Sequence, residues 1–255
     1  MLRTRIIPVL LLKGTSLVKT VRFNKYSYIG DPCNTVRIFN ELEVDEISIL
    51  DIEATNKKKD PKYNLISDIA SEAFMPLSYG GGIDSLDKAK KILSLGIEKV
   101  ILNSAAIINP EIISEIAGVF GSQAVVVSVD VKTSFLDKNY SIYSNSGKKK
   151  ASLEIKSWTK RCEDLGAGEI MLNYINRDGT WQGYDIELYK MIQENINIPL
   201  IASGGAKNID NISDLLKYSN CSAAAVGSMV VFQKKDMGVL INFPKPEIIN
   251  EKLYS

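Results

Sequence analysis

The sequence predicts a single (β/α)₈ barrel, one domain that spans residues 1–255. Apolar segments rich in β-branched residues alternate with amphipathic helical patterns through about eight units, which is typical of such barrels. No stretch rich in proline, glycine and serine interrupts this alternation. The expected strands lie near residues 6–12, 47–51, 75–79, 99–103, 124–130, 169–174, 199–203 and 222–227. The expected helices lie near residues 32–43, 62–73, 85–95, 110–120, 151–165, 185–195 and 208–218, with a weaker one after residue 235.

The apolar segment at residues 124–130 ends in a carboxylate, Asp130. Its composition is typical of a parallel strand covered on both faces, and barrels place their chemistry at the carboxyl ends of such strands. Alignment with the first strand matches Lys132 to Lys13, an offset of 132 − 13 = 119 residues. Leu11 then takes the position that corresponds to Asp130. This pairing of leucine with an acid is the central question about function.

An internal repeat predicts that the barrel consists of two similar half-barrels of four units each. Gly80–Gly82 recurs as Gly204–Gly205 after 124 residues, and Ser104 recurs as Ser228 at the same offset. Glu46 and Glu169 open corresponding strands, 123 residues apart. Several landmarks in the same order favour a duplicated half-barrel over short helical repeats.

Residues 13–31 and 132–150 are longer than ordinary strand-to-helix connections, so we expect both at the mouth of the barrel, where lids form. In the second loop, the alternation at Ser141–Tyr143 and the break at Ser146–Gly147 predict a small hairpin. Asp31 and Asn109 each precede a proline, which predicts two capped helix starts.

Composition excludes several classes of function. Lys and Arg total 31 against 30 Asp and Glu, so no net field attracts nucleic acid or a membrane. The three cysteines are unclustered, and no apolar segment reaches the length of a membrane span. These features indicate a reduced, cytoplasmic protein. Histidine is absent, so acid–base work falls to carboxylates, lysine or tyrosine.

Two glycine turns predict phosphate binding at both sides of the mouth. Glycine lets backbone N–H groups approach an anion, and a following helix start adds a favourable dipole. Glycine also serves any tight turn, but two turns in symmetric places, each followed one strand later by serine, favour a ligand with phosphates at both ends. The expected ligand residues on these strands are Gly81, Gly82, Asn103, Ser104, Gly204, Gly205, Gly227 and Ser228.

Three acids, Asp51, Asp130 and Asp178, follow strands that should converge at the mouth. Each alone could be a helix cap or a salt-bridged loop residue, but together they indicate catalysis or substrate binding. Magnesium binding by the three carboxylates is the alternative. Because the glycine turns already supply anion recognition, we expect no metal and no cofactor.

Four charged residues, Arg5, Glu46, Lys99 and Glu169, immediately precede apolar strand segments and should lie at the bottom of the barrel. Solvated charges are the ordinary interpretation of each one. Two cations and two anions at one level can instead pair as a ring across the barrel axis, which would stabilise the fold or gate a passage.

At this stage the motifs resemble HisF, the cyclase subunit of imidazole glycerol phosphate synthase. The resemblance runs through nearly the whole chain in the correct order. It rests on Arg5–Pro8, Gly30–Pro32, Leu50–Ile52, Gly80–Ile83, Lys99–Val100, Asn103–Ala106, Gly121–Val127, Gly166–Ile170, Arg177–Thr180 and Ser203–Gly205.

The resemblance implies a barrel that binds a glutaminase subunit (HisH-like) on its bottom face and receives ammonia along its axis. Ammonia then attacks a bisphosphorylated ribonucleotide at the mouth. The four bottom charges would form the ammonia gate, Asp130 the second catalytic acid, and Lys19 a substrate contact in the first loop.

Three residues depart from the pattern of the family, all of them at the mouth. The first catalytic acid would fall on Leu11, Glu53 stands where a small hydroxyl residue is common, and Trp181 adds an aromatic residue. This combination resembles a HisF-like branch associated with acetamidino-sugar formation for surface polysaccharides, in which a separate amidotransferase uses the ammonia. Three interpretations stay open: an ammonia-delivery subunit, an ordinary cyclase in which Glu53 replaces the missing acid, and a non-catalytic scaffold that binds a phosphorylated metabolite and regulates the glutaminase.

Overall fold

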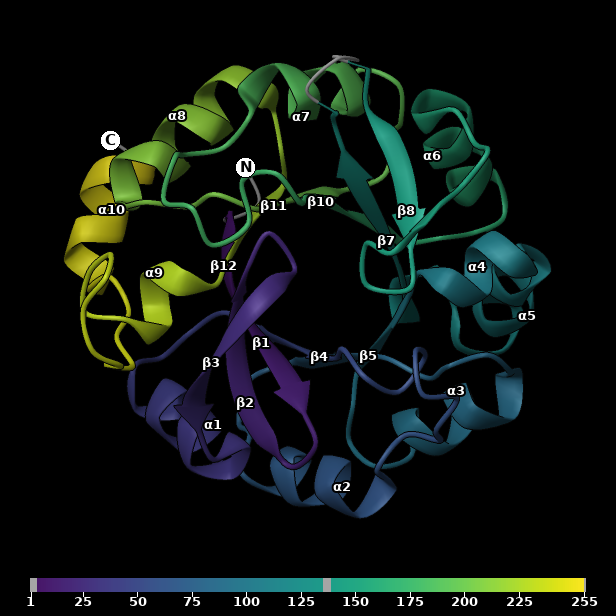
Figure 1. The fold of residues 1–255 in the computed structure, drawn as a ribbon, viewed down its shortest axis with the longest axis horizontal. Coiled ribbons are helices and arrows are strands. Elements are labelled where there is room, and N and C mark those ends of the chain that lie inside the picture. Colours follow the sequence, from purple (N-terminus) through teal and green to yellow (C-terminus); the bar gives the residue numbers. More distant parts are fainter. Residues whose placement is uncertain (1–3, 135–138, 255) are drawn as a thin grey trace.

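A computed structural model describes residues 4–134 and 139–254, which form a closed parallel barrel with helices around it (Figure 1). The ring closes because β1 pairs with β12 on one side and β4 on the other, while β7 pairs with β10. The (β/α)₈ prediction is confirmed. The barrel strands are β1 (Arg5–Lys13), β4 (Ile47–Asp51), β5 (Leu77–Gly80), β6 (Lys99–Leu102), β7 (Val125–Lys132), β10 (Glu169–Tyr174), β11 (Leu200–Ser203) and β12 (Ala223–Val226).

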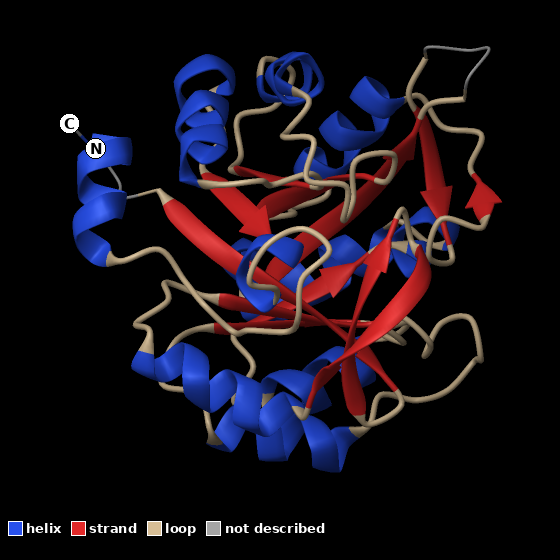
Figure 2. Ribbon diagram, turned by 60° about the vertical axis from the view of Figure 1, so that its left-hand side comes forward, coloured by secondary structure: helices blue, strands red, loops and turns tan. Residues whose placement is uncertain are grey.

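Helices cover the outside of the barrel, as the side view in Figure 2 shows. Their positions follow the sequence prediction, except that the last one begins at Pro246, well after residue 235. The outer helices are α1 (Pro32–Glu41), α2 (Tyr63–Ser71), α3 (Leu86–Leu93), α5 (Glu111–Phe120), α6 (Ile155–Asp164), α7 (Ile186–Gln193), α8 (Ile209–Ser219) and α10 (Pro246–Tyr254). Two short helices that the prediction missed, α4 (Ser104–Ile108) and α9 (Ser228–Val231), begin directly after β6 and β12, and a 3₁₀ turn covers Ser122–Ala124.

Alternation along the strands divides the apolar residues into two layers. Side chains such as Ile6 and Leu12 point outward and pack under the helices. Their neighbours Ile7, Val9 and Leu11 point inward and fill the barrel together with residues from the other strands. The inward positions therefore connect the bottom of the barrel to its mouth.

Two hairpins rise from the mouth, after β1 and after β7. The first consists of β2 (Ser16–Val21) and β3 (Asn24–Gly30), strands that the sequence prediction missed. The second consists of β8 (Ser141–Ser144) and β9 (Lys149–Lys150), which confirms the predicted small hairpin, although residues 135–138 of that loop lie outside the described residues. Phe23 reaches the second hairpin: a Cβ added to Gly147 would lie 3.2 Å from Phe23 Cδ2.

The two predicted helix caps have different outcomes. Asp31 caps α1 as expected, since its side chain accepts a hydrogen bond from Asn34 N at 2.9 Å. The cap predicted at Asn109 is wrong. That residue ends α4 instead, and α5 begins at Glu111 with no side-chain cap. The unpredicted helix α4 occupies the residues up to Ile108, so Asn109, just before Pro110, lies at the end of that helix and does not begin the next one.

Candidate active site

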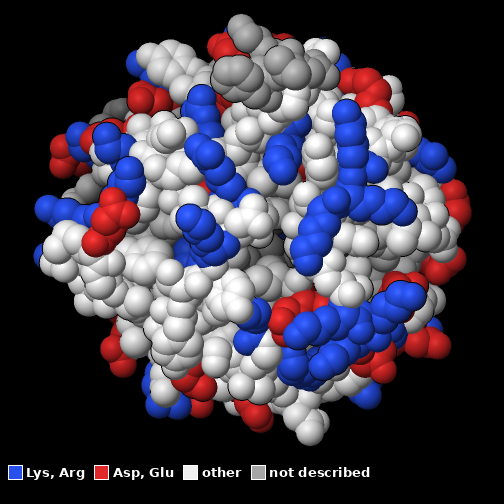
Figure 3. All heavy atoms as spheres, in the orientation of Figure 1, with Lys and Arg blue, Asp and Glu red and all other residues white. Residues whose placement is uncertain are grey.

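A cavity of about 160 Å³ lies at the carboxyl ends of the barrel strands. Figure 3 shows this face, with a hollow at its centre and Lys and Arg side chains around it. Every residue predicted to bind substrate lines this one cavity, as do Asp130 and Leu11. The substrate set is Lys19, Asp51, Gly81, Gly82, Asn103, Ser104, Asp178, Gly204, Gly205, Gly227 and Ser228.

The glycine turns need glycine for both conformation and space. Gly81 has a φ of +121°, and a Cβ there would lie 2.5 Å from the carbonyl oxygen of Asp51. Gly204 has a φ of +108°, and a Cβ would lie 2.7 Å from the carbonyl oxygen of Tyr174. The backbones at both turns therefore lie close to the preceding strand, which leaves no room for a side chain.

Lys19 joins the first hairpin to the turn between β12 and α9. Its Nζ donates to Asp178 Oδ1 at 2.7 Å, and Thr20 Oγ1 donates to Asp178 Oδ2 at 2.9 Å. A Cβ added to Gly227 would lie 2.7 Å from Lys19 Cε, so the lysine stem covers this turn. Asp178 thus holds a cation over the start of α9.

The opposite turn contacts the second hairpin. Ser104 Oγ accepts a hydrogen bond from Asn145 N at 2.9 Å, and Ser146 Oγ donates to Ile52 O at 3.1 Å. Each hairpin therefore lies over one side of the mouth, as expected for the lids predicted from loop length.

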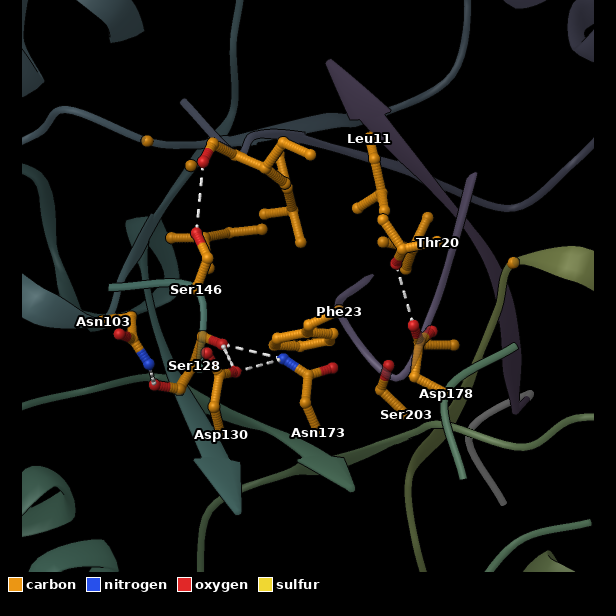
Figure 4. Close-up of a pocket in the computed structure, with 18 of the residues that line it drawn as sticks. Leu11, Thr20, Phe23, Asn103, Ser128, Asp130, Ser146, Asn173, Asp178 and Ser203 are labelled. Atoms are coloured by element: carbon orange, nitrogen blue, oxygen red, sulfur yellow. Dashed lines mark hydrogen bonds between the residues drawn. The ribbon is translucent and has the colours of Figure 1, made fainter. Parts of the chain in front are cut away.

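Asp130 is the buried carboxylate of the cavity, and two side chains fix its position (Figure 4). Its Oδ1 accepts hydrogen bonds from Ser128 Oγ at 3.1 Å and Asn173 Nδ2 at 2.8 Å. Burial raises the pKa of Asp130 to about 6, although these two bonds favour the ionised form. Across the mouth, Leu11 and its β-sheet neighbour Leu50 offer only alkyl groups.

The four bottom charges form the predicted ring. Arg5 donates to Glu46 Oε2 and to Glu169 Oε1, at 2.7 Å each. Lys99 Nζ contacts the same two carboxylates at 2.9 and 3.3 Å. Burial alone would lower the pKa of Arg5, but the two glutamates reverse this and raise it. Each charge in the ring has two partners of opposite sign, which offsets the cost of desolvation.

Comparison with known proteins identifies the family. Residues 5–236 match the family model described as "Histidine biosynthesis protein". A Leptospira borgpetersenii relative, provisionally named imidazole glycerol phosphate synthase subunit HisF, is 49% identical over 96% of both chains. A Pseudomonas aeruginosa relative, provisionally named subunit hisF2, is 46% identical over 96% of this chain and 97% of its own. A Hydrogenobaculum relative, named imidazole glycerol phosphate synthase subunit HisF, is 38% identical over 99% of this chain and 100% of its own. The chain belongs to the HisF family.

Two acids near the mouth of this HisF family member, Asp51 and Glu53, are held by hydrogen bonds and ion pairs to nearby residues of the chain. Asp51 Oδ1 accepts from the backbone N–H groups of Glu53 and Ala54 at 2.9 and 3.0 Å, and its Oδ2 accepts from Lys62. Glu53 does not line the cavity. It pairs with Lys57 at 2.7 Å, and this hydrogen bond lowers the pKa of its carboxyl. In this structure Glu53 therefore lies outside the cavity lining, and its substitution for the missing acid stays one of the open interpretations.

Sequence reasoning missed several polar or aromatic residues of the cavity, among them Ser128, Asn173, Ser203 and Phe23. Three of them carried a usable signal. Ser128 lies two residues before Asp130 in a strand, so both side chains face inward. Asn173 and Ser203 occupy the corresponding places near the ends of β10 and β11.

No described helix has the length and apolar character needed to cross a membrane. No three His, Cys, Asp or Glu side chains among residues 4–134 and 139–254 lie close enough together to hold a metal ion.

Replacing Asp130 with asparagine should change how stability depends on pH. The folded-state pKa of about 6 exceeds the ordinary value of an aspartate, near 3.8, so the folded protein binds the proton more tightly than the unfolded chain does. Wild-type stability should then fall by about 3 kcal/mol as pH rises from 4 to 6 and level off above. Asp130→Asn keeps a hydrogen-bond acceptor for Ser128 and Asn173 but carries no titratable carboxyl. The variant should therefore lack this loss of stability between pH 4 and 6.

Urea unfolding at pH 4.5 and 7.5 measures the difference. Asp130→Asn should be more stable than wild type at pH 7.5 and nearly equal at pH 4.5. The exposed carboxylate Asp214 provides the control, because Asp214→Asn should follow wild type at both values. Parallel pH profiles for wild type and Asp130→Asn would contradict the assigned environment.

Proposed function

We propose that this chain is the synthase subunit of a glutamine amidotransferase complex, in which a HisH-like glutaminase binds the barrel bottom and ammonia travels along the axis to the mouth. The ammonia serves the amidation of a sugar in surface-polysaccharide biosynthesis, through a separate amidotransferase. The observation that carries the proposal is Leu11, an apolar side chain where the HisF resemblance places the first catalytic acid. Loss of a general acid or base costs on the order of 10²-fold or more in rate.

The bottom ring supports conduction because it retains all four charges in a closed arrangement. Glu46 is buried, Glu169 is only 12% exposed, and each cation bridges the two carboxylates. A ring that only stabilised the fold would be replaceable by apolar residues at little cost. Small motions of Lys99, the most compact donor of the ring, would open a way between the charges.

The inward residues above the ring are small or polar on several strands. Ser48 and Ser78 lie side by side on β4 and β5, buried, with their hydroxyl oxygens 2.7 Å apart. Ala223 and Ala225 face inward from β12. These side chains offer ammonia hydrogen-bonding partners and space between the ring and the cavity.

The glycine turns predicted to bind phosphate line the cavity on both sides, so binding of a bisphosphorylated ligand at the mouth belongs to the proposal as well.

An ordinary cyclase of histidine biosynthesis is the second candidate. Similarity to the Hydrogenobaculum HisF over 99% of the chain favours it, as does the complete substrate set around the cavity. The position of Glu53 outside the cavity weighs against it. The acid that does line the cavity next to Leu11 and Leu50, Asp51, is bound to two backbone N–H groups and to Lys62. A non-catalytic scaffold that binds a phosphorylated metabolite is the third candidate.

A Leu11→Asp variant should gain cyclase activity that wild type lacks. The assay supplies the bisphosphorylated ribonucleotide of histidine biosynthesis with saturating ammonium salt, so that no glutaminase is needed. We expect a gain on the order of 10²-fold, the contribution of one general acid or base. Leu11→Asn, which is polar and of similar size but cannot exchange a proton, is the matched control and should stay inactive.

Normal turnover by wild type would contradict the proposal and favour the histidine-pathway cyclase. If neither protein turns over, binding of the bisphosphate measured by calorimetry separates the remaining interpretations, since binding without turnover in Leu11→Asp would favour the scaffold.

A Lys99→Met variant should uncouple glutamine hydrolysis from nitrogen delivery. Methionine preserves the length of the side chain but leaves the Glu46 and Glu169 carboxylates with Arg5 alone. The ratio of glutamine hydrolysed to product formed should rise severalfold in the glutaminase complex, while calorimetry shows unchanged ligand binding at the mouth. Lys90→Met, on the exposed surface of α3, controls for loss of a lysine. An unchanged ratio in Lys99→Met would argue against a channel.

A further inference from the structure

Three neighbouring strands place polar side chains side by side on one wall of the cavity. In the sheet register Asn173 of β10 lies opposite Asp130 of β7 on one side and Ser203 of β11 on the other. All three line the cavity, and neighbouring strands in a sheet are about 4.8 Å apart. We call Asp130, Asn173 and Ser203 the acceptor row (Figure 4).

The hydrogen bonds of the acceptor row leave acceptor atoms open to the cavity. Both bonds to Asp130 end on Oδ1, so its Oδ2 has no hydrogen-bond partner among the described residues. Asn173 Nδ2 donates to Ser128 Oγ at 2.9 Å and to Asp130 Oδ1. Because the carboxylate can only accept, the orientation of the Asn173 amide is fixed and its Oδ1 faces away from Asp130. In Figure 4 this oxygen lies on the side of Ser203.

The charge around the acceptor row is negative and lacks a counter-ion. Asp130 and Asn173 are each only 7% exposed, and Asp130 forms no ion pair within residues 4–134 and 139–254. Asp178, the other carboxylate whose charge acts on Asp130, is already paired with Lys19. A buried carboxylate without a cation favours a positively charged ligand.

The chemistry of the row selects among cations. It presents a carboxylate oxygen, an amide oxygen and a hydroxyl oxygen from one wall, while Leu11 and Leu50 cover the opposite wall. Calcium takes six to eight oxygen ligands, and magnesium needs near-ideal octahedral geometry. A small ion with several N–H donors matches three directional acceptors better than a spherical ion does.

We propose that the acceptor row is a binding site for ammonium at the mouth end of the barrel axis, with N–H donors directed to Asp130 Oδ2, Asn173 Oδ1 and Ser203 Oγ. This deepens the proposed function, since it retains nitrogen that has travelled along the axis. Ammonia that arrives along the axis becomes ammonium by taking the proton of a protonated Asp130, so one O–H bond at Oδ2 breaks as one N–H bond forms. For release as ammonia, that N–H bond breaks and the proton returns to Asp130 Oδ2. A pKa of about 6 for Asp130, raised by burial, is compatible with that proton transfer.

The test titrates ammonium chloride into the chain alone at pH 7.5 and follows the side-chain amide resonances of ¹⁵N-labelled asparagine. An Asn173→Ser variant assigns the Asn173 signal by its disappearance. Potassium chloride at the same ionic strength is the control ion, because potassium has a similar size but no N–H donors. We expect a saturable shift of the Asn173 amide with ammonium and none with potassium.

Two variants localise the binding. Asp130→Asn is nearly isosteric and should weaken ammonium binding by about tenfold or more, the loss for one hydrogen bond to a charged group. Ser213→Ala, on the outer helix α8, should bind like wild type. Equal shifts with potassium, or wild-type binding by Asp130→Asn, would overturn the proposal.

The experiment contains neither glutaminase nor acceptor enzyme, so its result is separable from that of the coupling assay. Absence of ammonium binding would leave the channel standing, and failure of coupling would leave the acceptor row standing.

Discussion

The alternation of side chains along eight parallel strands is the constraint on which the rest of this structure depends. Every second residue faces the barrel axis, so one strand carries a bottom charge, an apolar interior and a mouth residue in order. β1 does this with Arg5, Ile7, Val9 and Leu11. A shift by one residue would turn all of these side chains toward the helices. The register of each strand therefore fixes which side chains face the axis at the bottom and at the mouth of the barrel together.

The two ends of the axis have opposite electrostatic character. At the bottom, two cations and two anions compensate each other within 3.3 Å. At the mouth, Asp130 has hydrogen bonds but no counter-ion among the described residues, and an apolar wall faces it. A neutral, closed entrance and an anionic exit would favour the passage of ammonia and its retention as ammonium at the far end. Under the proposed function, Leu11 takes the place of the partner that would make the mouth a two-acid catalytic site.

Much of this site could be predicted from the sequence because its signals are local. Glycine turns, bottom charges and Asp130 each stand next to an apolar strand segment. Closure of the barrel then brings the turns and Asp130 to one cavity at the mouth and the four charges to one ring at the bottom. The hairpin of β2 and β3 was missed because Ser16–Val21 pairs with both β1 and β3, contacts that a single loop does not reveal. Asn109 did not cap because α4 took up that residue. The position of the Glu53 side chain could not be predicted because it depends on a nearby lysine, Lys57, which binds its carboxylate. Duplication of half-barrels remains a prediction from the repeats.

Passage of nitrogen along the barrel axis is tested most directly by the isotopic composition of the amidated product. The wild-type chain, its glutaminase and the acceptor enzyme would receive glutamine labelled with ¹⁵N at the amide, in buffer that contains excess unlabelled ammonium. Passage within the barrel predicts a product that carries mainly ¹⁵N, because ammonia from the bottom face does not mix with the bulk. A product whose isotopic ratio follows the bulk ammonium would contradict passage through the ring of Arg5, Glu46, Lys99 and Glu169.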